Sequence, residues 1–137
     1  MRRFPLLALV VVAACASPAD QGPGRDLLGA WRYTATQSAP TASLTGTFTV
    51  TTQTGSAFGG RLEVQETDAA GVLRSRAGAV SGRAPASLSV DFDVLLGTAP
   101  RRHVARVVAD TMEGNWVETG GTSITTGVFR AVRIAGQ

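Results

Sequence analysis

The chain is poor in the residues that most metal and redox sites use. It has 137 residues, of which one is a cysteine (Cys15) and one is a histidine (His103). One cysteine excludes an internal disulfide and a cysteine-based metal cluster, and one histidine excludes a two-histidine metal site within a single chain. No recognisable calcium-binding loop occurs either. We therefore expect no metal and no cofactor.

The glycine motifs of catalysis and phosphate binding are also missing. The sequence has no Gly-x-Ser-x-Gly nucleophile elbow and no phosphate-binding glycine loop. The pairs Gly59-Gly60 and Gly120-Gly121 are better explained as bends or turns. We predict that no residue is catalytic and that the protein is not an enzyme.

A long apolar run is lacking as well, and the short one near the N-terminus is typical of a signal peptide. Leu6 to Val12 is too short to cross a bilayer as a helix of about 20 residues. Arg2 and Arg3 precede it and Ala13-Ala14 follow it, in the order that secretory signal peptides use. Residues 1–14 are therefore predicted to be a signal peptide outside the fold.

The end of this segment, Val12-Ala13-Ala14-Cys15, resembles the bacterial lipobox. The resemblance implies that Cys15 is lipidated on sulfur, becomes the new N-terminus and holds the protein at a membrane. The alternative is an ordinary cysteine beside a conventional cleavage site. In the lipoproteins that it resembles, an Asp after the cysteine favours retention in the inner membrane. Ala16-Ser17 at this place imply the outer membrane, with the protein facing the periplasm.

The charge of the remaining chain is close to neutral. All 13 basic residues are arginines, and without residues 1–14 the chain keeps 11 of them against 10 acidic residues. A nucleic-acid-binding domain needs a basic surface, which this balance does not supply. We expect no nucleic-acid partner.

Composition divides the rest of the chain into a tether and one domain. Residues 15–26 hold the lipidated cysteine and a segment with two prolines and two glycines, so they are predicted to be a flexible tether. Residues 27–137 carry short runs rich in Val, Thr, Phe and Leu, separated by Gly, Pro, Asp and Ser. Eight strands are expected, at about 28–35, 44–52, 57–66, 72–81, 87–94, 103–110, 112–118 and 124–134.

The strand pattern predicts an all-β domain. Leu44, Phe48 and Val50 alternate with threonines, which puts one face of the strand on a core and the other in water. The linkers are too short for crossover helices, so consecutive strands are expected to be antiparallel neighbours. An even number of such strands favours a closed eight-stranded up-and-down barrel, and an open β-sandwich is the alternative.

Gly29-Ala30-Trp31 at the start of the first strand resembles the Gly-x-Trp signature of lipocalins and other calycin barrels, including the avidin-like ones. In these families a basic residue of the last strand packs across that tryptophan and closes one end of the barrel. The resemblance implies that Arg133 closes the barrel over Trp31. The other lipocalin signatures and the biotin-binding residues of avidins are absent, so the resemblance implies no particular ligand.

The connections distinguish the two ends of the expected barrel. At the end of Trp31 the connections are predicted to be short, and longer segments at 36–43, 67–71, 95–102 and 119–123 predict a mouth at the opposite end. Arg101-Arg102 is expected at this mouth, as a contact for an acidic partner or a ligand headgroup.

Five residues are candidates for contact with a ligand. By strand parity, His103 and Glu118 face the mouth, and Trp116 and Phe129 face the interior. Tyr33 is expected beside them. The alternatives are a histidine at a wet rim, a frayed strand end for Glu118, and aromatic side chains that only fill the core.

Two functions from different classes remain open. A barrel of eight strands either holds one small ligand or is filled by its own side chains. The residues inferred to face inward include both bulky and small ones, so they do not decide between the two. The bulky ones are Trp31, Tyr33, Phe48, Phe58, Phe92 and Trp116, and the small ones are Ala35, Gly46, Gly60, Ala77, Ala79, Ala105 and Gly114. Arg74 and Arg76 are expected on the outer face. We favour a lipid-anchored binding module for a small apolar or amphipathic ligand. The alternative is an envelope protein that binds other proteins through its loops, including a protease inhibitor with a filled barrel.

The anchor leads to a first prediction. Cys15→Ala removes the sulfur that carries the lipid, so the variant should take up no labelled palmitate in growing cells and should accumulate as precursor or soluble protein. The wild-type chain should incorporate the label. A wild-type chain that stays unlabelled would contradict the lipobox interpretation.

Overall fold

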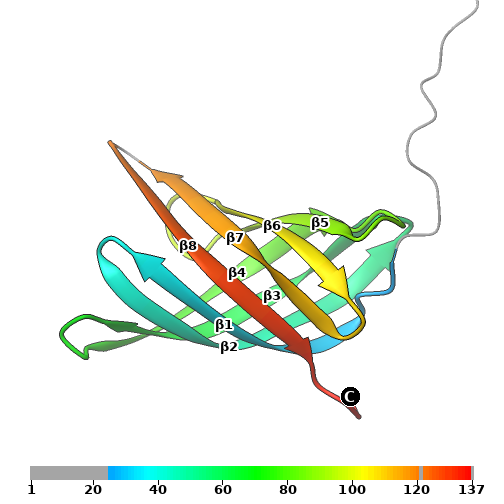
Figure 1. Cartoon of the computed structure of the whole chain (residues 1–137), viewed down its shortest axis with the longest axis horizontal. Coiled ribbons are helices and arrows are strands. Elements are labelled where there is room, and N and C mark those ends of the chain that lie inside the picture. Colours follow the sequence, from blue (N-terminus) through cyan, green and yellow to red (C-terminus); the bar gives the residue numbers. More distant parts are fainter. Residues whose placement is uncertain (1–24, 121, 137) are drawn as a thin grey trace, which may run out of the picture.

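The computed structural model describes residues 25–120 and 122–136, which form a closed antiparallel barrel with strand order β1 to β8 (Figure 1). Its strands are β1 (Gly29–Ser38), β2 (Thr41–Thr54), β3 (Ala57–Asp68), β4 (Leu73–Arg83), β5 (Ser89–Val94), β6 (Arg101–Val108), β7 (Thr111–Gly120) and β8 (Ser123–Arg133). The predicted eight-stranded up-and-down barrel is therefore confirmed, and the open sandwich is wrong. The predicted signal peptide and Cys15 lie outside the described residues.

In the described part of the chain, no helix is long and apolar enough to span a membrane.

Alternation of apolar and polar side chains produces the curved sheet. On β2, Leu44, Phe48 and Val50 are buried, and the threonines between them are wholly or partly exposed. Each strand pairs with the next, and β1 pairs with β8 from Trp31↔Arg133 to Gln37↔Gly127. Closure between the first and last strands leaves no continuous open edge along the barrel.

Glycines on the inner face allow the sheet to bend tightly. A Cβ at Gly46 would collide with the backbone carbonyl of Glu63 on β3, and a Cβ at Gly114 would collide with that of Val104 on β6. Neighbouring strands approach these glycines more closely than any other residue permits. At Gly46 and Gly114, which were predicted on the inner face, the small residue therefore allows the sheet to curve.

The two ends of the barrel differ in a way that loop length does not predict. The expected mouth has the hairpins β1–β2, β3–β4 and β7–β8 and a loop at 95–100. The loop predicted at 95–102 is therefore largely present. The long segments predicted at 36–43 and 119–123 are wrong, because β1 continues to Ser38, β2 begins at Thr41 and β7 continues to Gly120. Hairpins β3–β4 and β7–β8 project beyond the rest of the barrel (Figure 1).

The orientation of β4 differs from the prediction. Gly78 and Val80 face the core, whereas Ala77 and Ala79 are exposed, so Arg76 lies on the inner face of the strand. Two facts explain the reversal. Gly78 has no room for a Cβ because it touches the carbonyl of Leu95, and the charge of Arg76 is balanced inside by a glutamate described below.

Arg133 closes the other end of the barrel, which we call the sealed end. Its guanidinium carbon lies 4.4 Å from the centroid of the Trp31 ring. Nη1 donates to Leu28 O at 2.6 Å, Nη2 donates to Asp26 O at 2.8 Å, and Nε donates to Asp110 Oδ1 at 3.2 Å. The guanidinium therefore binds a ring, two carbonyls and a carboxylate at once.

The segment before β1 supplies those carbonyls because it crosses the sealed end. Leu27 is fully buried there, its N–H donates to Gln53 Oε1 at 2.9 Å, and its carbonyl accepts a bond from Trp31 Nε1 at 3.0 Å. Arg25 N donates to Ala84 O at 3.1 Å, so residues expected in the tether already contact the barrel. The described chain enters and leaves at this end (Figure 1).

Candidate functional site

The middle of the barrel is occupied by one cluster of aromatic rings. Its members are Tyr33, Phe48, Phe58, Phe92, His103 and Phe129, joined by ring-to-ring contacts with centroids 4.5 to 6.4 Å apart. Phe92 and His103 stack at 4.5 Å, and Phe48 stacks on Phe92 at 5.3 Å. All six side chains are buried. This part of the interior is a packed core, so a ligand has to bind elsewhere.

A hydrogen-bonded pair, Tyr33 and His103, lies within this cluster. Nδ1 of His103 lies 3.0 Å from the carbonyl oxygen of Arg101, which can only accept, so Nδ1 carries the proton. Nε2 is then an acceptor, and it lies 3.0 Å from the Tyr33 hydroxyl, which donates to it. Both nitrogens of the neutral ring are satisfied.

Burial keeps both members of the pair uncharged. It lowers the pKa of His103 to about 3, with the positive charge of Arg101 lowering it further and the backbone bond to Arg101 opposing this. Burial also raises the pKa of Tyr33 well above its usual range, and the charge of Arg101 offsets part of that rise. The pair is therefore a neutral structural element around neutral pH.

The depth of Tyr33 and His103 differs from the prediction. We expected His103 to face the mouth, but both side chains are fully buried in the core beside Phe129. Strands of a closed barrel are tilted and staggered, so the place of a residue along its strand does not give its depth.

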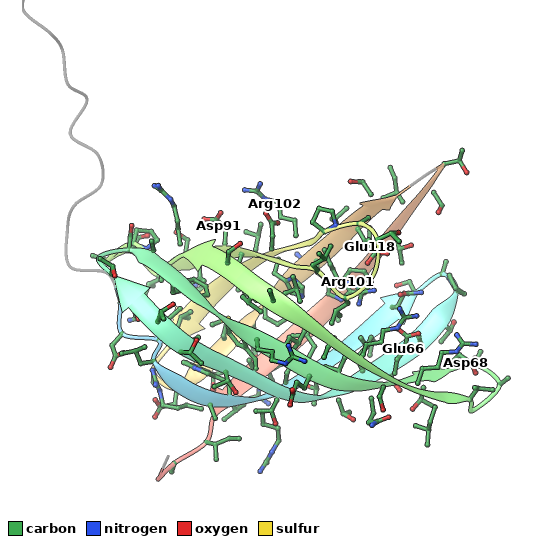
Figure 2. The ribbon with its side chains drawn as sticks, turned by 180° about the vertical axis from the view of Figure 1, so that it is seen from behind. Glu66, Asp68, Asp91, Arg101, Arg102 and Glu118 are labelled. Carbon is green, nitrogen blue, oxygen red and sulfur yellow. The ribbon has the colours of Figure 1, made fainter. Side chains whose placement is uncertain are left out.

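The mouth side of the core is formed by Trp116, Arg101 and Glu118. Trp116 on β7 is fully buried, and the guanidinium carbon of Arg101 lies 4.0 Å from its ring centroid. Nε of Arg101 donates to Glu118 Oε2 at 3.1 Å, across the pair of strands β6 and β7 (Figure 2). The structure thus brings together two of the predicted residues, Trp116 and Glu118, with an arginine between them.

Arg101 was predicted at the mouth together with Arg102, and burial distinguishes the two. Arg101 is only 4% exposed, whereas Arg102 is exposed. Arg101 shares the inner face of β6 with His103, Ala105 and Val107. Extending that alternation by two residues toward the N-terminus would have placed it inside.

Two buried donors of this group have no acceptor among the described residues. They are Nη1 of Arg101 and Nε1 of Trp116. A buried polar group without a partner costs about 1–3 kcal/mol, and more when it is charged. Such groups in a stable fold are usually explained by a role in binding or catalysis, or by bound solvent.

A second ion pair lies on the inner face near the mouth. Glu66 of β3 is 8% exposed, and its Oε1 accepts a bond from Arg76 Nη2 at 3.2 Å. Nε of Arg76 lies 2.9 Å from Oε2 without the angle of a hydrogen bond. Toward the tip of the hairpin, Arg74 and Asp68 form a looser pair at 3.7 Å. Glu66 and Asp68 lie on the inner side of this hairpin, and the mouth carries paired charges (Figure 2).

A hollow in the outer surface lies behind Trp116. After Gln37↔Gly127 the strands β1 and β8 diverge. A hollow of about 330 Å³ lies at this fork, lined by Ser38, residues 115–117 and residues 126–128. Gly127 lies directly against the indole, since a Cβ there would collide with its ring. We refer to this hollow as the fork.

A larger hollow, of about 600 Å³, lies on the outer face of β1, β2, β7 and β8. Most of its lining side chains, such as Thr34, Thr45 and Val128, point outward and are exposed. Its charged side chains, Glu113 and Arg130, pair with each other at 3.0 Å. It is a shallow surface depression without a buried polar group, and we do not consider it a site.

Comparisons with known proteins identify the architecture. No family model matches the chain, and no curated protein sequence is similar to it. Solved structures do match. EF1p2_mFAP2b bound to DFHBI superposes with a TM-score of 0.65 at 14% identity, covering 79% of this chain and 94% of that one. The chain shares the small eight-stranded β-barrel fold of this designed protein.

Two further structures agree. A redesigned β-barrel, mFAP1, bound to DFHBI has a TM-score of 0.62 at 14% identity and covers 78% of this chain and 94% of its own. A de novo designed fluorescence-activating β-barrel has a TM-score of 0.59 at 16% identity, with 78% of this chain and 93% of its own covered. At these identities the likeness shows the shared fold alone.

Metal-binding residues do not gather in the described part of the chain, where no three His, Cys, Asp or Glu side chains are placed to hold an ion.

The buried histidine leads to a prediction about pH. Above about pH 6.5, His103 is neutral in both the folded and the unfolded chain, and it adds no pH dependence. As the pH falls from 6.5 to about 3, the unfolded chain binds a proton that the folded chain does not. The free energy of unfolding should therefore fall by up to about 1.4 kcal/mol per pH unit in this window.

Urea unfolding at several pH values between about 5 and 7 measures this slope, with His103→Gln as the control. The variant should have the lower stability at neutral pH and a flatter profile. An equal slope in the two proteins would mean that His103 is not buried in its neutral form.

Proposed function

We propose that the protein is a lipid-anchored binding module of the cell envelope, which holds one small molecule with an apolar body in the mouth half of its barrel. The observation that carries the proposal is the difference between the two Trp–Arg pairs. At the sealed end, the polar groups of Trp31 and Arg133 have acceptors from the chain itself. At the mouth, the buried donors Trp116 Nε1 and Arg101 Nη1 have no acceptor among the described residues.

The composition of the inner face supports a seat at the mouth. Between the aromatic cluster and the rim, the inner face is lined mainly by small and aliphatic side chains: Ala35, Ala42, Leu44, Val64, Gly78, Leu96 and Gly127. An apolar lining with a few polar groups is the usual composition of a small-molecule site. The designed barrels EF1p2_mFAP2b and mFAP1, which share the fold, were each solved with the small molecule DFHBI bound.

The N-terminal end supports the anchor. The lipobox places the lipid at Cys15, and the described chain begins at Arg25, at the sealed end. The ten residue steps from Cys15 to Arg25 reach at most about 33–36 Å when extended, and a chain with proline and glycine is usually shorter. The sealed end would then lie toward the membrane, and the mouth would face the periplasm.

A second function is favoured by the apolar tips of the hairpins. Leu73 is 66% exposed and Ile124 is 71% exposed, and both lie at the mouth end. Exposed apolar side chains at a loop end, above a filled core, would suit an envelope protein that binds another protein. Protease inhibition belongs to this class.

The two functions are separated by a binding experiment with N-phenyl-1-naphthylamine, a neutral apolar dye that fluoresces in apolar surroundings. Thr125→Trp adds a bulky side chain on the inner face of β8 beside Glu118, so it should block the mouth and abolish saturable binding of the dye. Ala79→Trp adds the same side chain on the exposed face of β4 and should bind like the wild type.

Thermal unfolding of both variants shows whether each barrel is intact. Saturable binding to the wild type that is lost only in Thr125→Trp supports the binding module. If the folded wild type shows no saturable binding, the interaction protein becomes the better account.

A further inference from the structure

The two Trp–Arg pairs of the barrel are built alike, so the satisfied pair indicates what the other one lacks. In each pair a guanidinium lies over an indole, at 4.4 Å for Arg133 on Trp31 and at 4.0 Å for Arg101 on Trp116. In each pair Nε of the arginine donates to one carboxylate, Asp110 or Glu118.

The pairs differ in their neutral acceptors. At the sealed end, three backbone carbonyls, those of residues 26, 27 and 28, accept bonds from Arg133 Nη2, Trp31 Nε1 and Arg133 Nη1 respectively. At the mouth, Arg101 Nη1 and Trp116 Nε1 are buried without an acceptor among the described residues. The side chain of Arg101 is 5% exposed, and Trp116 is fully buried.

We infer that the ligand of this site presents uncharged carbonyl oxygens, as an amide, an ester or a peptide group does, to Arg101 Nη1 and Trp116 Nε1. The inference rests on the proposed function and names the chemical class of the ligand. The bound molecule would take the place that the carbonyls of residues 26–28 occupy at the sealed end, with its apolar body against the small side chains of the mouth half.

Charge decides between an uncharged carbonyl and a carboxylate. The guanidinium of Arg101 is already paired with Glu118 at 3.1 Å, and the neighbouring charges Glu66 and Arg76 neutralise each other. A ligand carboxylate on Arg101 would therefore lie beside the carboxylate of Glu118 in a buried site. Like charges at such a distance repel strongly where water is excluded. A carbonyl oxygen accepts the same hydrogen bonds without this repulsion.

Gly127 of β8 closes the route from the fork to this indole. A Cβ at Gly127 would collide with the ring of Trp116 and with the carbonyl oxygen of Thr36, so the backbone is packed against the ring here. The hollow at the fork, of about 330 Å³, lies on the outer side of this contact, where Val117 and Val128 are exposed. We therefore expect the ligand to reach the indole N–H from the mouth.

Matched probes of equal chain length test the inference. Octanamide and octanoate differ only in the head group, and isothermal titration calorimetry on the full-length protein measures both at neutral pH. Octanamide should bind saturably, and octanoate should bind at least about tenfold more weakly. Octanoate that binds as tightly as octanamide would overturn the inference.

Two variants test the partners. Trp116→Phe keeps an aromatic ring under Arg101 and removes only the indole donor, so its affinity for octanamide should fall by about fivefold to tenfold. Trp31→Phe is the matched control, because it loses the bond to Leu27 at the sealed end. Its unfolding midpoint should fall, and its affinity for octanamide should stay at the wild-type value.

Glu118→Gln removes the competing charge and should raise the affinity for octanoate toward that for octanamide. Unchanged octanamide binding in Trp116→Phe, or unchanged octanoate binding in Glu118→Gln, would refute the assignment. The naphthylamine dye carries no carbonyl group, so its binding tests the proposed function without testing the ligand class. Saturable dye binding with a failed amide test removes only the ligand class, whereas loss of both removes the binding module as well.

Discussion

Closure between β1 and β8 is the constraint on which the rest of the structure depends. An antiparallel meander of eight strands has two free edges until its first and last strands pair. Here they pair over seven residue pairs, from Trp31↔Arg133 to Gln37↔Gly127. The contact of Arg133 with Trp31 joins this ladder at the sealed end, and the carbonyls of the preceding segment fix the guanidinium in place. With that end closed, any opening to the interior has to lie at the other.

The fold was predictable because its main determinant is local. Alternation along β2, with Leu44 and Phe48 inside and threonines outside, is visible in the sequence and fixes which face is buried. The parity of β4 was not predictable in the same way, because alanine and glycine fit either face. Its orientation follows from the lack of room at Gly78 and from the pairing of Arg76 with Glu66, which are both tertiary effects.

The candidate site was predictable only in part, for a related reason. Strand parity identified the inner faces that carry Trp116 and Glu118, and the structure joins them through Arg101. The depth of Tyr33 and His103 depends on strand tilt and stagger, which single-strand patterns do not contain. A buried arginine is also rare enough that sequence reasoning assigns it to the surface by default. Here the carboxylate of Glu118 and the ring of Trp116 stabilise it inside.

In the proposed function, two similar Trp–Arg pairs at opposite ends of one barrel allow a packed core to coexist with a binding site. The aromatic cluster and the sealed end provide a rigid base, and the mouth keeps the donors that the described chain leaves without acceptors. Rigid placement of such donors favours binding because little ordering is needed when a ligand arrives.

The chain has only two tryptophans, so its indole N–H groups report on the two ends separately. A titration of ¹⁵N-labelled protein with octanamide, followed by the two indole cross-peaks in ¹H–¹⁵N spectra, is therefore the most direct measurement of the central claim. Our account predicts that the Trp116 cross-peak moves to a saturating position while the Trp31 cross-peak stays in place. Movement of the Trp31 cross-peak alone, or saturable binding that leaves Trp116 unmoved, would contradict it.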